Sequence, residues 1–147
     1  MKKFIFLAAV LCLSANSVLF AQKLSSAKVP EVVKKALQSK SPNAENGKWE
    51  MEGGNYEVNY KAKGESISMQ FSPTGKWLET ETKLTGTIPA LVTLTINKDY
   101  KGFKMGAPEK IETSDRGTLY EVVLKKDKES WEVLFNADGK VLKKDKE

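Results

Sequence analysis

The sequence contains no histidine and only one cysteine, Cys12, which lies in an apolar stretch near the N-terminus. The rest of the chain therefore cannot form a Ser-His-Asp triad, a cysteine nucleophile or a zinc site of thiolate and imidazole ligands. A disulfide framework is excluded as well, so a hydrophobic core must stabilise the fold, and 147 residues are enough to form one. We expect no enzymatic activity, no cofactor and no metal.

Long hydrophobic runs are also missing. The one apolar run, Phe4 to Leu13, is shorter than the roughly 20 residues that cross a bilayer. Lys2 and Lys3 precede this run, and small residues follow it as far as Ala21. This order predicts a secretory signal peptide over residues 1–21. We expect a periplasmic or secreted protein with no membrane span after cleavage of the signal.

A continuous basic stripe is the third missing feature. The net charge is +5, but 24 basic residues are interspersed with 19 acidic ones. The basic pairs at 125–126 and 143–144 are interrupted by acids, as solvated loops and tails usually are. The charge pattern therefore predicts no binding to nucleic acid.

What the chain does contain is a repeat. FSPTGKWLE at 71–79 returns as FNADGKVLK at 135–143, and ten of 23 positions are identical when 56–78 is aligned with 120–142. Self-similarity at this period indicates duplication of one supersecondary unit. We divide the chain into a signal peptide (1–21), a linker (22–28), a first repeat (29–86) and a second repeat with a charged C-terminal tail (87–147).

Each repeat is predicted to begin with a helix and to continue as antiparallel strands. Pro30 and Pro89 stand where the first turn of a helix tolerates proline. Apolar and polar residues then alternate over 56–61 and 66–71, as in half-buried strands. Gly75 and Gly139 supply the positive φ that a tight turn needs before the next strand. The fold class is therefore α+β, with each helix covering the apolar face of its own hairpins.

These motifs resemble a known family. A helix that starts at proline, then YEV, then F-x-x-x-G-K-x-L, in tandem after an export signal, is similar to the PepSY-like family of exported bacterial proteins with the β-lactamase-inhibitor-protein-like fold. The resemblance covers roughly residues 29–142 and implies one curved antiparallel sheet with both helices on its convex side. It also implies that the other face is a candidate binding surface. No inhibitory residue can be matched, and the longer connection at 98–110, with Thr93 and Thr95 before it, leaves the extent of the second helix open.

The two repeats differ on the outward side of their strands. If Leu78 and Leu142 point toward the helices, the second repeat has more apolar residues facing away from them than the first. This comparison predicts an apolar binding patch formed by Trp77, Val123, Leu134 and Val141. The alternative is a second small core beneath the 98–110 connection. Trp49 and Trp131 are expected in the main core.

The function that these observations favour is a non-enzymatic periplasmic binding module. It would engage an exported protein or peptide, or another copy of the chain, on the open face of its sheet, and an inhibitor of an exported hydrolase is a special case. The alternative is a carrier of a small apolar ligand between sheet and helices. An enzyme that uses strand carboxylates is the third class, with its candidates being Glu50, Glu52, Glu79 and Glu81.

Overall fold

The structure, a computed structural model, describes residues 22–44 and 46–147, so the predicted signal peptide lies outside the described residues. The helices are α1 (Glu31–Lys40) and α2 (Ala90–Asp99), and a short 3-10 helix covers Ser26–Lys28. The strands of the first half are β1 (Gln22–Leu24), β2 (Lys48–Glu52), β3 (Asn55–Ala62), β4 (Glu65–Phe71) and β5 (Trp77–Lys83). Those of the second half are β6 (Lys104–Met105), β7 (Glu109–Thr113), β8 (Gly117–Lys126), β9 (Glu129–Asn136) and β10 (Val141–Lys146).

All ten strands belong to one antiparallel sheet. Its order is β1-β2-β3-β4-β5-β7-β8-β9-β10, and the short β6 pairs with β8. The junction between the two repeats is the β5–β7 pair, in which Glu81 lies opposite Ile111. The predicted α+β fold with a shared antiparallel sheet is confirmed.

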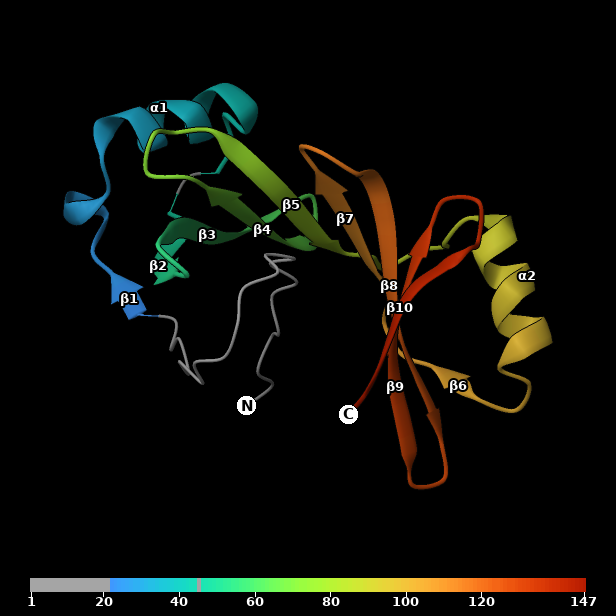
Figure 1. Ribbon diagram of the computed structural model, residues 1–147. Helices are drawn as coiled ribbons and strands as arrows, with labels where there is room; N and C mark the ends of the chain where they lie inside the picture. The colour runs from blue at the N-terminus through green and yellow to red at the C-terminus, as the bar shows by residue number, and fades with distance from the viewer. Residues whose placement is uncertain (1–21, 45) are drawn as a thin grey trace, which may run out of the picture.

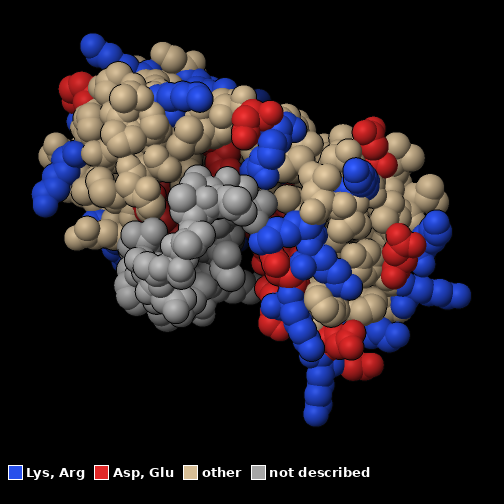
Figure 2. Space-filling view, in the orientation of Figure 1, with Lys and Arg blue, Asp and Glu red and all other residues tan. Residues whose placement is uncertain are grey.

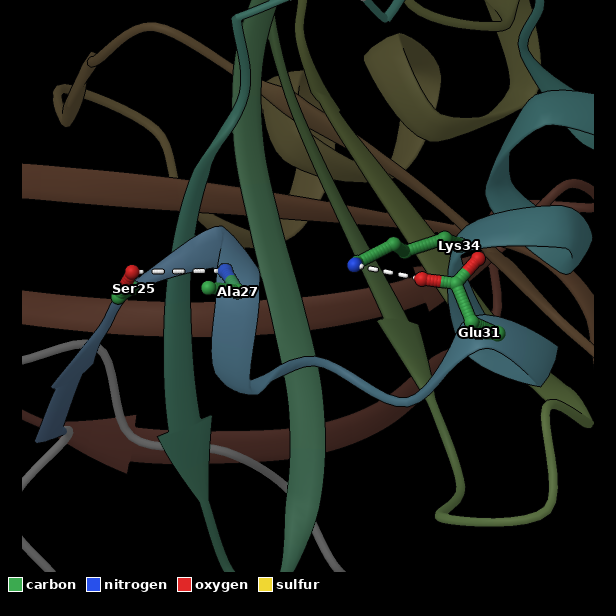
Figure 3. Close-up of polar contacts among 4 residues, drawn as sticks. All are labelled: Ser25, Ala27, Glu31 and Lys34. Carbon is green, nitrogen blue, oxygen red and sulfur yellow. Dashed lines mark hydrogen bonds and ion pairs between the residues drawn. The ribbon is translucent and has the colours of Figure 1, made fainter.

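Local polar contacts lie before and within the first turn of α1, whose own N-cap residue, Pro30, makes no side-chain capping hydrogen bond. The Ser25 hydroxyl accepts a hydrogen bond from the Ala27 amide at 3.4 Å, which caps the 3-10 helix (Figure 3). Pro30 then has a φ of −59°, close to the helical value. In the first turn of α1, Lys34 Nζ lies 2.8 Å from Glu31 Oε1, an i,i+3 ion pair on the exposed side (Figure 3).

The second helix is as long as the first. α1 and α2 each have ten residues, so the extent that the sequence left open is now known. Threonines lower the intrinsic helix propensity of α2. Tertiary packing offsets this cost, because Val92 is fully buried and Ile96 is 7% exposed.

Each helix packs on its own half of the sheet. The first core contains Val29, Val33, Leu37, Trp49, Val58, Tyr60, Met69 and Phe71. The second contains Ile88, Val92, Ile96, Tyr100, Val122, Leu124, Val133 and Phe135. The core position predicted for Trp49 is confirmed, and Trp131 packs partly buried against the second core.

The sheet bends between its two halves. In Figure 1, α1 lies above the half formed by β1–β5, and α2 lies on the outer side of the half formed by β7–β10. Both helices are thus on the outer side of the bend, as the family resemblance implied. The opposite side of the sheet, which we call the open face, receives neither helix.

Candidate functional site: the open face of the sheet

The open face is defined by the strand residues that alternate with the two cores. Strand pairing places Asn59 opposite Ser68, and Ser68 opposite Glu81. Core residues such as Val58 and Met69 are paired on the other side. Because side chains alternate along a strand, this register assigns every described residue of the central strands to one face.

The predicted apolar patch is wrong for two of its four members. Trp77 packs against the first core and Val141 against the second, so both lie on the helix side. The reason is a register irregularity in each repeat: the β4–β5 pairing shifts between Gln70 and Phe71, and the β9–β10 pairing shifts at Val141. A β-bulge breaks the alternation from which the patch was inferred, and Leu142 is left 46% exposed.

The other two members lie on the open face but are not a free patch. Leu134 is 6% exposed and forms a small buried cluster with Ile111 and Leu119. Val123 is half-buried, and its carbonyl oxygen accepts a hydrogen bond of 2.8 Å from the Gly106 amide. The cluster fits the alternative of a second small core better than an exposed binding patch, and a binding role for Val123 and Leu134 remains a prediction.

The most prominent feature of the open face is a group of glutamates contributed by six strands. We call it the glutamate band, and its members are Glu50, Glu52, Glu57, Glu79, Glu81, Glu109, Glu121 and Glu132. Two pairs are direct cross-strand neighbours, namely Glu50 with Glu57 and Glu109 with Glu121. Like charges in such positions destabilise a sheet. These pairs therefore lower the stability of the sheet when both carboxyl groups are ionised, although a soluble sheet does not need glutamates opposite one another.

The environment of the band raises the pKa values of four of its carboxyl groups. Burial, followed by the charges of Glu79 and Glu109, raises the pKa of Glu81 to about 8. Burial and the neighbouring Glu132 raise the pKa of Glu121 to about 8. For Glu52, burial and then Glu57 raise the pKa to about 7. Several carboxyl groups on this face thus titrate close to neutral pH, well above their usual range.

Burial also raises the pKa of Glu79, against the opposing effect of the positively charged Arg116. Arg116 lies in the β7–β8 turn, where its amide donates a 2.9 Å hydrogen bond to Thr113 Oγ1. Among the causes of these four pKa shifts, the side chain of Arg116 is the one cation that favours the ionised form. Positive charge therefore lies beside the band at two places, at Arg116 in the β7–β8 turn and at Lys83, whose Nζ is 3.7 Å from Glu109 Oε1.

The open face is hollowed over β3, β4 and β5, where a cavity of about 470 Å³ lies. Its floor is buried or half-buried and consists of Glu57, Asn59, Ser68 and Glu81. Its rim is exposed and includes Asn46, Lys48, Lys61 and Ser66. Lys83 and Glu109, whose charged groups are 3.7 Å apart, line the side toward β7. In Figure 2, red acidic atoms are visible in the recess between the two halves of the molecule.

The floor of this hollow is held by hydrogen bonds. Glu57 is 8% exposed, and its Oε1 accepts from Asn59 Nδ2 at 2.8 Å and from Ser68 Oγ at 2.9 Å. These two neutral donors hold the buried carboxyl group in one position. The geometry is that of a preformed acidic floor.

Within residues 22–44 and 46–147, the glutamates are not arranged as a metal site, since no group of three or more acidic side chains there has the geometry to hold a metal ion. No helix in this part of the chain is long and apolar enough to span a membrane. The chemistry of the open face therefore has to be considered in terms of hydrogen bonding and charge.

Two helix-and-hairpin repeats on one bent antiparallel sheet define the β-lactamase-inhibitor-protein-like class of folds. The family model of candidate beta-lactamase-inhibitor-like, PepSY-like proteins matches residues 19–70 and 55–143, so the chain belongs to the PepSY-like family. The two matches overlap the two repeats. No curated protein sequence matches the chain.

Solved structures from Bacteroides share this fold. A BLIP-like protein from Bacteroides fragilis is 23% identical, with a TM-score of 0.72 over 80% of this chain and 85% of that one. A DUF2874 family protein from Bacteroides ovatus is 18% identical, with a TM-score of 0.74 over 80% and 86%. A protein from Bacteroides eggerthii, described as a candidate periplasmic protein, is 18% identical, with a TM-score of 0.74 over 80% and 88%. At these identities the likeness shows the fold.

Proposed function

We propose that this protein is a non-catalytic binding module of the periplasm that holds an exported polypeptide on the open face of its sheet. The observation that carries the proposal is the placement of buried and half-buried glutamates in direct cross-strand contact on the face that receives neither helix. Lysines also lie on this face, Lys83 among them, yet two pairs of glutamates are direct neighbours there, an arrangement that folding and solubility do not require. Departures from local stability rules are typical of functional surfaces.

The fold and the comparisons support a polypeptide partner. The cavity is about 470 Å³ and extends over four strands, from Lys48 on β2 to Glu81 on β5, which suits a segment of chain better than an enclosed small molecule. One structural neighbour is named for its likeness to an inhibitor protein, and another is described as a candidate periplasmic protein. The signal-peptide pattern at residues 1–21 agrees with an exported location.

The alternative of an apolar-ligand carrier places its ligand between sheet and helices, whereas this hollow lies on the opposite face and is no better suited to such a ligand. Glu57, Asn59, Ser68 and Glu81 form its floor, and an apolar ligand there would remove charged and polar groups from water without replacing their hydrogen bonds. The hollow gives no support to catalysis by the glutamates either. The four glutamates with raised pKa values share similar causes, burial and other carboxylates, whereas paired acid and base roles require environments that separate two pKa values.

A steric block tests the proposed surface without assuming the chemistry of the partner. Ser66, on the rim of the hollow, is changed to Trp, and Ser39, exposed on α1, is changed to Trp as the matched control. The exported protein and both variants serve as baits for envelope polypeptides, which are identified by mass spectrometry. We expect one polypeptide to be retained by the parent and Ser39→Trp baits and lost from Ser66→Trp. Equal retention by all three folded baits would place the binding surface elsewhere.

A further inference from the structure

The hollow over β3, β4 and β5 has an ordered distribution of charge. Its floor carries two carboxyl groups, those of Glu57 and Glu81, and its exposed rim carries the ammonium groups of Lys48, Lys61 and Lys83, of which Lys83 lies 3.7 Å from the carboxyl group of Glu109. This separation by depth follows from the register. Glu81, Ser68, Asn59 and Lys48 occupy successive strands in one row, from the middle of the sheet toward its edge. A ligand that matches the hollow has positive charge at its tip and negative charge around its base.

We infer that this hollow receives a lysine or arginine side chain of the polypeptide partner, and that acidic residues on either side of it in the partner meet the rim lysines. The inference rests on the proposed function and specifies the partner's chemistry at the same surface. The volume of about 470 Å³ is ample for one long side chain together with the adjoining backbone. Charge complementarity of this kind determines partner choice more than affinity.

The hydrogen bonds of the floor hold Glu57 in position for a ligand. Asn59 and Ser68 both donate to Oε1 of Glu57, so this carboxylate is fixed before a ligand arrives. An ammonium or guanidinium group between Glu57 and Glu81 would also relieve the mutual repulsion of the band. Burial and neighbouring carboxylates raise the pKa of Glu81 to about 8, so binding of a cation there would release a proton below that pH.

Two charge-reversed peptides test the inference. One has a single lysine between pairs of glutamates, the other a single glutamate between pairs of lysines, and an uncharged Gly-Ser peptide of equal length is the blank. Dissociation constants are measured by NMR titration at about 0.15 M salt, where long-range attraction between exposed charges is screened. We expect the lysine-centred peptide to bind at least about tenfold more tightly than the other two.

Matched variants locate that binding. The double variant Glu57→Gln, Glu81→Gln keeps the size of both floor side chains, and we expect it to weaken binding of the lysine-centred peptide about tenfold or more. Glu112→Gln is the control, because Glu112 pairs with Thr80 on the opposite face of the same sheet. Equal binding of both charged peptides, no binding of either, or equal loss in the control would overturn the inference. If Ser66→Trp removes an envelope partner while the peptides fail in this way, the proposed function stands and the inferred chemistry falls.

Discussion

Gly139 lies directly against the backbone carbonyl group of Leu91, so closely that a Cβ atom at position 139 would overlap it. Gly75 has the same relationship to Val32 in the first repeat, where a Cβ atom would come within 2.9 Å of the carbonyl oxygen. In the second repeat, Thr95 Oγ1 also donates a 2.8 Å hydrogen bond to the Gly139 carbonyl. The phrase that occurs twice in the sequence therefore attaches a strand turn to the first turns of a helix, and so fixes each helix on its half of the sheet.

Replacing Gly139 by alanine should destabilise the protein more than an ordinary glycine substitution in a turn. Gly139 has a φ of 79°, and Gly64 in the β3–β4 turn has a φ of 83°, but no atom lies within 4 Å of a Cβ atom at Gly64. We expect Gly64→Ala to cost about 1 kcal/mol from backbone strain alone, and Gly139→Ala about 2–4 kcal/mol. Urea unfolding measures both. Equal losses would show that the contact with Leu91 contributes nothing.

Stability should fall as pH rises through neutrality. The pKa of Glu81 is raised from 4.5 to about 8 and that of Glu52 to about 7. A group that binds its proton more tightly in the folded state contributes stability that is full below about pH 4.5 and lost as the pH passes 7–8. The Tm should therefore be higher at about pH 5.5 than at about pH 9, by on the order of 5 °C.

The variant Glu81→Gln should flatten this dependence, because glutamine cannot ionise. The control Glu112→Gln, on the opposite face, should keep the slope of the parent protein. A Tm that rises with pH over this range, or a Glu81→Gln variant with an unchanged slope, would contradict the raised pKa values of the glutamates on the open face.

Trp77 should contribute to stability and not to partner binding. Its Nε1 donates a 2.9 Å hydrogen bond to Thr80 Oγ1, and Lys40 Nζ of α1 lies 3.4 Å from the centre of its ring. We expect Trp77→Ala to lower the free energy of unfolding by about 2–3 kcal/mol, since the ring is partly buried. Retention of envelope polypeptides by the folded variant should equal that of the parent. Loss of binding without loss of stability would show instead that Trp77 takes part in binding the partner.

The local features of this fold were predictable from the sequence because their causes are local. Alternation gave the strands around residues 56–61 and 66–71, and Gly75 and Gly139 marked the turns. The misplacement of Trp77 and Val141 has an equally definite cause. Each follows a turn at which the register shifts by a bulge, and a bulge leaves no mark in the alternation of apolar and polar residues.

The glutamate band was only half visible in the sequence. KWEME and LETETK carry glutamate at every second position, so each strand alone shows an acidic face. Solubility explains such a face in a single strand equally well. The band becomes recognisable only when β5 pairs with β7. β7 covers Glu109–Thr113, at the end of the segment that the sequence analysis described as a connection. Pairing between strands of different repeats is a tertiary contact, and the residue pattern within a single strand does not reveal it.

Binding of a polypeptide to the open face can be observed in the cell by photo-crosslinking. A photoreactive phenylalanine analogue is placed at Ser66 on the open face, or at Ser39 on the outer side of α1, in the protein expressed with its own N-terminal sequence. We expect one discrete adduct with another polypeptide from position 66, and none from position 39. An adduct from position 39 alone, or no adduct from position 66, would contradict binding at the open face.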